Sequence, residues 1–290
     1  MSGLPAEHVD ILDGPVGTEL LRRGVQTPLP LWSAGAIDSA PEVLSQIHAD
    51  YARAGASVHT ANTFRTQPRK LGAGFEALAT RAVELARAAV PTSARVAGSL
   101  APVEDCYRPD LSPLEGAREE HRQLARTLAE AGCDLLLCET FPVAREAWVA
   151  VEECVATGVE TWAAFTAGPD GTLLTPEAMH AAARGALERG ASCILVNCTP
   201  AALTLPYVEA LAALGGRVGA YANAGHPDDA LGWTAADVPA AARYVDLAET
   251  WRRAGASVLG GCCGTGPAHC AALAQRFAAH EAQRQRPARS

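Results

Sequence analysis

Three cysteines, Cys198, Cys262 and Cys263, are the residues of this sequence whose type and placement indicate metal chemistry. The last two are adjacent and are flanked by Gly261 and Gly264, which let the backbone turn so that both sulfurs aim at one point. Three thiolates bind Zn²⁺ in preference to Mg²⁺ or Ca²⁺, and they leave one tetrahedral position open for a substrate. The sequence therefore predicts a catalytic zinc site. The alternative is that the three side chains pack in the core as small apolar groups.

The elements that must position these cysteines alternate along the chain. Short β-rich runs, most of them continuously apolar, alternate with longer Ala-rich runs, as expected for parallel strands buried on both faces. The expected strands are 9–13, 57–62, 95–100, 134–139, 161–166, 192–197, 217–222 and 257–262, and the expected helices are 41–53, 75–89, 118–131, 144–157, 176–189, 200–214, 239–254 and 267–281. This α/β pattern predicts a (β/α)₈ TIM barrel. A doubly wound open sheet is the alternative, but no G-x-G-x-x-G run follows the first strand.

The chain shows no linker that would divide it, so we expect a single barrel domain over residues 1–282 and a flexible C-terminal tail at 283–290. Four helix-to-strand junctions resemble one another, with a glycine just past each helix: Gly55, Gly132, Gly190 and Gly255. Glycine there permits a left-handed cap, after which a tight turn enters the next strand. These junctions precede the second, fourth, sixth and eighth expected strands.

Polar side chains concentrate where the expected strands end. Asp13-Gly14, Asn62, Glu139, Asn197-Cys198, Asn223 and Cys262-Cys263 all lie there. In a TIM barrel this edge holds the catalytic groups. We therefore expect the three cysteines to lie near Asp13 and Glu139, two carboxylates that favour an ammonium group. Helix capping is the alternative role of Asp13 and of the asparagines.

The other six cysteines are expected to be structural. Cys133, Cys154, Cys193 and Cys270 fall in helices, junctions or strand starts, Cys106 falls in a loop, and Cys138 falls on the fourth strand as a core residue. An odd number of cysteines, nine, does not suggest a disulfide framework, so reduced thiols are expected.

Charge and hydropathy exclude several kinds of partner. The formal net charge is −8, which argues against nucleic acid or an anionic membrane as the main partner. We find no basic region followed by an apolar stretch at the N-terminus, and no apolar run long enough to span a bilayer. A cytoplasmic location, small-molecule partners and a monomer or small homo-oligomer are the expectations that follow.

Several motifs together resemble the homocysteine S-methyltransferase family. They are Asp13-Gly14-Pro-Val-Gly17-Thr18-Glu19-Leu20, Leu31-Trp32-Ser33, His48-Ala-Asp50-Tyr51, Ala54-Gly55-Ala56, Cys138-Glu139-Thr140, Asn197-Cys198, Tyr221-Ala-Asn223-Ala-Gly225 and Gly260-Gly261-Cys262-Cys263-Gly264-Thr265, and they run from about Asp10 to about Ala272. The resemblance implies a zinc barrel that methylates homocysteine to methionine. It implies that Cys198, Cys262 and Cys263 are the metal ligands. It also implies that Asp13 and Glu139 hold the amino end of homocysteine, and that the backbone at Gly14 receives the carboxylate.

The chemistry of these residues agrees with that implication. A free alkyl thiol is mostly protonated at neutral pH, and binding to Zn²⁺ deprotonates it. The methyl donor must be an onium or a similarly activated centre, so that the leaving group departs neutral. Asn223 is a further candidate for substrate binding. Trp32, Phe64, Phe141 and Tyr221 are candidates for a cation–π wall, with core packing as their alternative.

The methyl donor is left open by the sequence. The family uses S-methylmethionine or S-adenosylmethionine, betaine, or a methylfolate delivered through cobalamin. The chain length leaves no room for cobalamin domains or for the C-terminal extension of betaine enzymes, so a sulfonium donor is expected, S-methylmethionine first. His226, where sulfonium-using relatives often have an acidic residue, departs from that pattern. A different barrel enzyme, or a zinc-binding protein with structural cysteines, is the remaining alternative.

Overall fold

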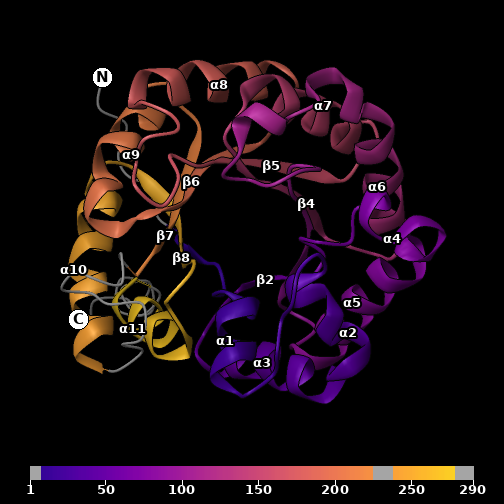
Figure 1. Ribbon diagram of the computed structural model, residues 1–290. Helices are drawn as coiled ribbons and strands as arrows, with labels where there is room; N and C mark the ends of the chain where they lie inside the picture. The colour runs from indigo at the N-terminus through magenta and orange to yellow at the C-terminus, as the bar shows by residue number, and fades with distance from the viewer. Residues whose placement is uncertain (1–7, 225–237, 278–290) are drawn as a thin grey trace, which may run out of the picture.

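Eight parallel strands form one sheet that curves into a barrel (Figure 1). The structure, a computed structural model, describes residues 8–224 and 238–277. The strands are β1 (Asp10–Ile11), β2 (Val58–Thr60), β3 (Arg95–Leu100), β4 (Leu135–Phe141), β5 (Glu160–Phe165), β6 (Cys193–Pro200), β7 (Arg217–Asn223) and β8 (Ala256–Gly261). Their order is β1-β8-β7-β6-β5-β4-β3-β2, and a parallel bridge between Leu12 and Val58 joins the two ends. The TIM-barrel prediction is confirmed.

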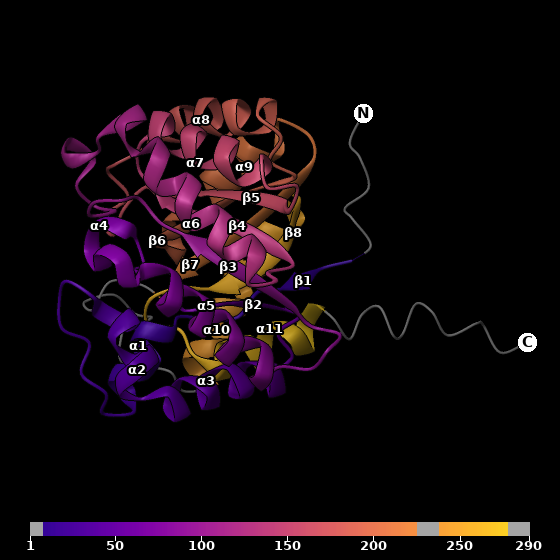
Figure 2. The same ribbon diagram turned by 90° about the vertical axis from the view of Figure 1, so that its right-hand side faces the viewer.

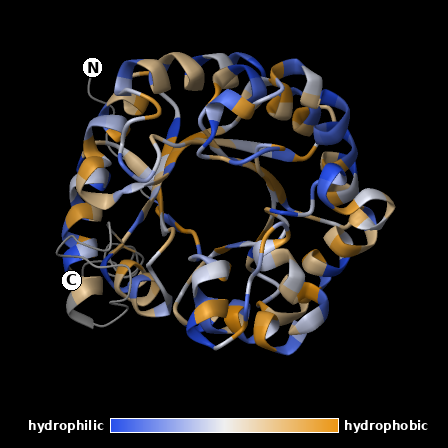
Figure 3. Ribbon diagram, viewed as in Figure 1, coloured by the Kyte–Doolittle hydropathy of each residue, from blue (hydrophilic) through white to orange (hydrophobic). Residues whose placement is uncertain are grey.

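Helices surround the barrel and carry both hydrophilic and hydrophobic stretches (Figures 2 and 3). They are α1 (Val16–Arg22), α2 (Ala36–Ser39), α3 (Pro41–Arg53), α4 (Pro68–Leu71), α5 (Phe75–Ala89), α6 (Arg118–Glu130), α7 (Ala144–Val155), α8 (Pro176–Glu188), α9 (Leu205–Ala212), α10 (Val238–Arg253) and α11 (Pro267–Phe277), with 3₁₀ turns at Trp32–Gly35, Gly72–Gly74, Pro109–Leu111, Leu114–Ala117 and Ala201–Leu203. Within the described residues, no helix combines the length and the apolar character that crossing a bilayer requires.

The expected elements are present, with differences at their ends. Residues 16–22 form a helix that the periodicity did not predict, because it is only seven residues long. The helix expected at 200–214 is shorter, since β6 continues to Pro200 and a 3₁₀ turn precedes α9. The C-terminal tail and the domain boundary expected at residue 282 lie outside the described residues.

Glycines at the helix-to-strand junctions have the expected left-handed conformation. Their φ angles are +96° at Gly55, +85° at Gly132, +100° at Gly190 and +118° at Gly255. At Gly55 a β-carbon would also lie 2.7 Å from the Cβ atom of Ala274 in α11, so the junction packs too closely for a larger residue. These turns let each helix lie back against the strand that follows it.

Apolar side chains fill the end of the barrel where the strands begin. A cluster of buried residues that includes Leu135, Leu195 and Val258 occupies the interior, and Trp162 on β5 is its largest member. The indole of Trp162 donates to Glu160, and the guanidinium of Arg217 lies 4.7 Å from the ring centroid. The strand starts are sealed in this way, and the pocket described below lies at the opposite edge.

Candidate active site

The three cysteines predicted as ligands converge at the C-terminal edge of the barrel. Cys198 lies on β6 and Cys262-Cys263 follow β8, and the three Sγ atoms all lie within 4.8 Å of one another. Three thiolates bound to zinc at about 2.3 Å in tetrahedral geometry would be about 3.8 Å apart, so the donor set fits that ion. Hydrogen bonds from Cys198 and Cys262 hold the pKa of the Cys263 thiol well below its usual value. The cluster therefore already favours a thiolate.

Cys198 reaches this cluster because β6 bulges. The register with β7 shifts between Asn197 and Pro200, and Cys198 has a φ of +48°. Strand β4 has a matching bulge, where Thr140 has a φ of +63°. The Asn197 side chain braces both bulges, because its Oδ1 accepts from the Thr140 amide at 3.1 Å and its Nδ2 donates to the Thr140 hydroxyl at 2.7 Å. The role of Asn197 in the structure is thus to order the ligand-bearing backbone.

The Cys262-Cys263 turn is held from three sides. The Cys262 amide donates to Ala222 on β7, and the Ala224 amide donates to the Cys263 carbonyl. The Thr265 hydroxyl donates to the Cys262 carbonyl at 2.8 Å, and it lies so close to residue 261 that only glycine fits there. Arg22 of α1 donates to the carbonyls of residues 264 and 265, so the unpredicted helix α1 anchors the Cys262-Cys263 turn.

Asp13 lies buried after β1 with two uncharged histidines behind it. Its Oδ2 accepts from the Thr60 amide at 3.0 Å and lies 4.0 Å from Nδ1 of His59. Ligand atoms of Asp13, His48 and His59 all lie within 4.8 Å of one another. Burial lowers the pKa of His48 to about 3 and that of His59 to about 4, and it raises the pKa of Asp13. Neither ring is charged at neutral pH, so neither supplies a cation to the carboxylate.

This arrangement was not expected from the sequence. The eight histidines show no metal-like spacing in the sequence, so neither His48 nor His59 is predicted to lie beside a carboxylate. Strand β2 and helix α3 bring the two rings together only in the folded chain. Alternation along β2 predicts that the side chain of His59 points away from the face that carries Val58 and Thr60. It does not predict which residues His59 contacts on its own face.

Glu139 on β4 is the second buried carboxylate of the site. It accepts hydrogen bonds from the Ser99 hydroxyl and, at 3.0 Å, from the Tyr221 hydroxyl. Burial raises its pKa in spite of these donors. Both predicted carboxylates therefore line one pocket together with the three cysteines, as expected from the strand ends.

The pocket has a volume of about 260 Å³ and is lined by the predicted residues Asp13, Gly14, Glu139, Cys198, Cys262 and Cys263. A β-carbon at residue 14 would lie 2.6 Å from the Tyr51 hydroxyl, so glycine is required there. Asn223 is buried beside the site, but it does not line the pocket, and its contact with a substrate stays a prediction. Gly225 and His226 lie outside the described residues.

Aromatic residues form part of the wall. Trp32, Phe64 and Tyr221 line the pocket, and the rings of Trp32 and Phe64 meet edge to face at a centroid distance of 5.9 Å. Phe141 is fully buried and packs against His121, so it belongs to the core.

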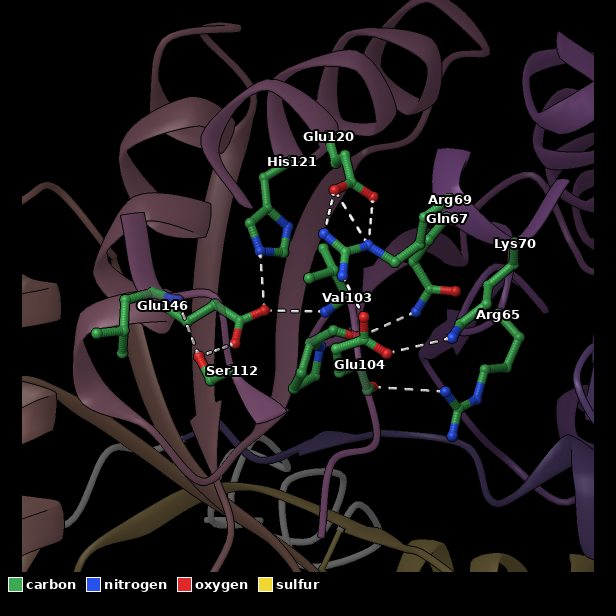
Figure 4. A network of polar contacts seen from close by, with 12 residues as sticks. Arg65, Gln67, Arg69, Lys70, Val103, Glu104, Ser112, Glu120, His121 and Glu146 are labelled. Atoms are coloured by element: carbon green, nitrogen blue, oxygen red, sulfur yellow. Dashed lines mark hydrogen bonds and ion pairs between the residues drawn. The ribbon is translucent and has the colours of Figure 1, made fainter. Parts of the chain in front are cut away.

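The segment between β3 and α6 closes one side of the pocket with Cys106 and Tyr107. Cys106 is buried, yet its Sγ does not belong to the cluster of Cys198, Cys262 and Cys263. Figure 4 shows the polar contacts that hold this segment, among them the bonds of Glu146 to the Val103 amide and the Ser112 hydroxyl. The sequence did not predict either lining residue, because an irregular segment carries no periodic signal.

Five of the six other cysteines lie away from the pocket lining, as expected of structural residues, whereas Cys106 lines the pocket. Sγ of Cys138 lies 3.5 Å from Sγ of Cys154 inside the core, and no cysteine forms a disulfide. Cys133, Cys193 and Cys270 are also buried, away from the pocket lining.

Comparison with known proteins identifies related enzymes. Residues 10–277 match the family model described as homocysteine S-methyltransferase. The chain is 32% identical to homocysteine S-methyltransferase of Escherichia coli strain K12, over 94% of this chain and 96% of that protein. It is 30% identical to homocysteine S-methyltransferase YbgG of Bacillus subtilis, over 89% and 90%. The crystal structure of metallated homocysteine methyltransferase MmuM from Escherichia coli superposes with a TM-score of 0.78 at 29% identity, covering 93% of this chain and 96% of that one.

Proposed function

The chain belongs to the homocysteine S-methyltransferase family, and from this premise we propose that it moves a methyl group from a sulfonium donor to homocysteine, with zinc as cofactor. The donor is S-methylmethionine or S-adenosylmethionine, and the product is methionine. The observation that carries the proposal is the convergence of Cys198, Cys262 and Cys263 on one point that opens into the pocket. When bound there, zinc would lower the pKa of the homocysteine thiol and so supply a thiolate nucleophile.

The residues around the metal cysteines are suited to hold an amino acid. Asp13 and Glu139 carry carboxylates into the pocket, and Asp13 has only uncharged histidines behind it. An ammonium group of the substrate would therefore provide the positive charge that these buried carboxylates lack. The open backbone beside Gly14 is the proposed place for the substrate carboxylate.

The methyl transfer balances without any further reactant. The thiolate sulfur forms a bond to the methyl carbon while the bond between that carbon and the donor sulfonium breaks. The electron pair of the broken bond stays on the donor sulfur, which leaves as a neutral thioether, and the thiol proton passes to solvent. Trp32 and Phe64 present aromatic surface to the pocket, which favours a cationic donor before transfer.

The absence of a disulfide among the nine cysteines fits a reducing compartment. All nine are free thiols, so we propose a cytoplasmic location and methionine formation as the biological role.

A donor screen tests the proposed function. Zinc-loaded protein is incubated with homocysteine and, separately, with S-methylmethionine, S-adenosylmethionine or betaine, and methionine is quantified by chromatography. We expect turnover with the sulfonium donors and none with betaine, and no turnover from any donor in Cys198→Ala. Turnover with betaine alone would replace the sulfonium assignment by a betaine-dependent one.

A further inference from the structure

Arg65 is the one basic side chain among the described residues that line the pocket. It follows β2 by five residues and shares the pocket with the carboxylates of Asp13, Asp105 and Glu139. Both proposed substrates are amino acids, so two carboxylates as well as two ammonium groups must be accommodated. A cation in a pocket otherwise rich in carboxylates therefore bears directly on substrate orientation.

The guanidinium of Arg65 has little compensation from the protein. Its only hydrogen bond within the described chain is a long one, 3.5 Å from Nη1 to the Glu104 carbonyl, and its Nε is buried without a partner. No carboxylate of the described residues lies within ion-pair distance of it. Figure 4 shows the contrast with Arg69 and Lys70, which both pair with the Glu104 carboxylate.

A half-buried, unpaired guanidinium is costly unless a ligand supplies the opposite charge. Its planar fork matches a carboxylate, which accepts two parallel hydrogen bonds from it. The structure thus offers a carboxylate-binding group that the protein itself leaves unused.

Neighbouring side chains place Arg65 on the donor side of the pocket. Its Cζ lies 5.6 Å from the Phe64 ring centroid, and Phe64 packs against Trp32, the aromatic pair suited to a sulfonium.

We propose that Arg65 binds the α-carboxylate of the methyl donor, so that this enzyme selects sulfonium donors that are amino acids. The inference rests on the proposed function, which assigns the carboxylate of homocysteine to the backbone beside Gly14. The carboxylate of the donor then remains for Arg65, and the sulfonium between them lies against Phe64 and Trp32.

Two donors that differ only in the carboxylate test the proposal. S-methylmethionine carries it, and (3-aminopropyl)dimethylsulfonium retains the sulfonium and the amine without it. In the wild type we expect kcat/KM to be roughly 10- to 100-fold higher for S-methylmethionine, the effect of one charge-assisted carboxylate contact. In Arg65→Gln we expect KM for S-methylmethionine to rise by that factor, while KM for homocysteine and turnover of the decarboxylated donor stay unchanged. Arg65→Lys should recover part of the preference.

Arg108→Gln is the matched control, since Arg108 is exposed in the segment between β3 and α6, does not line the pocket and pairs with Asp110. It should behave as the wild type. A wild type without preference for the carboxylated donor overturns the assignment, and this comparison needs no variant. Equal loss with both donors in Arg65→Gln also overturns it, because that result shows a structural role. A wild type that turns over with neither of these donors overturns the Arg65 assignment, and one that also fails with S-adenosylmethionine overturns the proposed function as well.

Discussion

Cys198 occupies a left-handed backbone conformation, with a φ of +48° on a residue that carries a β-carbon. Such a conformation costs about 1–3 kcal/mol and persists only where the surroundings impose it. Here the Asn197 amide, the Thr140 hydroxyl at 3.9 Å from Sγ and the Thr166 hydroxyl, which donates to the Cys198 carbonyl at 3.2 Å, impose it. The strain directs one sulfur toward two others that arrive from a different strand.

At the residue scale we expect Cys198→Ala, Cys262→Ala and Cys263→Ala each to abolish both zinc binding and turnover. The number of zinc ions per protein, measured by elemental analysis, should fall from about one to near zero. The reason is that a catalytic zinc site needs three protein ligands and each variant keeps only two. Circular dichroism should show an intact fold, since the cluster lies at one edge of the barrel. Cys133→Ala, a buried cysteine outside the pocket, is the control and should keep its zinc. Full zinc in all three ligand variants would rule out this cluster as the metal site.

At the scale of elements, the segment from β3 to α6 carries three pocket residues, Asp105, Cys106 and Tyr107, and depends on one buried carboxylate. Glu146 of α7 accepts from the Val103 amide at 2.9 Å and from the Ser112 hydroxyl, and it lies 3.4 Å from His121. Burial would raise the pKa of Glu146, but these donors outweigh it and hold the pKa below its usual value. The ionised form is therefore the one that stabilises the segment (Figure 4).

We expect Glu146→Gln to lower the free energy of unfolding by about 1–3 kcal/mol at neutral pH, the cost of removing a buried charged acceptor. The pKa of Glu146 is lowered on folding, so its contribution is complete above about pH 4.5, the unfolded value, and is lost as the pH falls through the folded pKa. The difference between wild type and variant should therefore narrow on acidification, as measured by urea unfolding at a series of pH values.

Glu119→Gln, which removes an exposed partner of Arg122, is the control and should change stability little at any pH. A stability difference for Glu146→Gln that stays constant from pH 7 to below pH 4 would contradict an ionised Glu146.

At the scale of the whole molecule, stability and chemistry occupy opposite ends of the barrel. Trp162 fills the end where the strands begin, beneath the guanidiniums of Arg95 and Arg217. The pocket opens where the strands end and contains none of these three residues. Changes at the filled end should therefore reach the site only by unfolding the barrel.

We expect Trp162→Phe to destabilise the protein by about 1–3 kcal/mol, because it removes buried ring atoms and the indole donor of Glu160. Below the melting transition, kcat and KM for both substrates should match the wild type. Urea unfolding measures the change in stability, and steady-state kinetics on the same preparation measure kcat and KM. A large fall in kcat without loss of folded protein would show that the two ends are coupled.

The sequence alone predicted the barrel, the edge that carries the pocket and the cysteines proposed as ligands. Eight apolar runs alternating with helical runs can be buried on both faces in few ways, and a barrel places every strand end at one edge. For that reason Asp13, Glu139 and the three cysteines could be expected near one another, although Cys198 and Cys262 are far apart along the chain.

Only the tertiary structure decided how the site is completed. The paired bulges at Thr140 and Cys198, the uncharged histidines behind Asp13 and the unpaired guanidinium of Arg65 depend on contacts between segments that are distant in sequence. Periodicity reports which face of an element is buried, and it carries no information about what that face meets. Partnering and charge compensation are properties of the folded chain, so the groups that complete the proposed site could not be identified from the sequence.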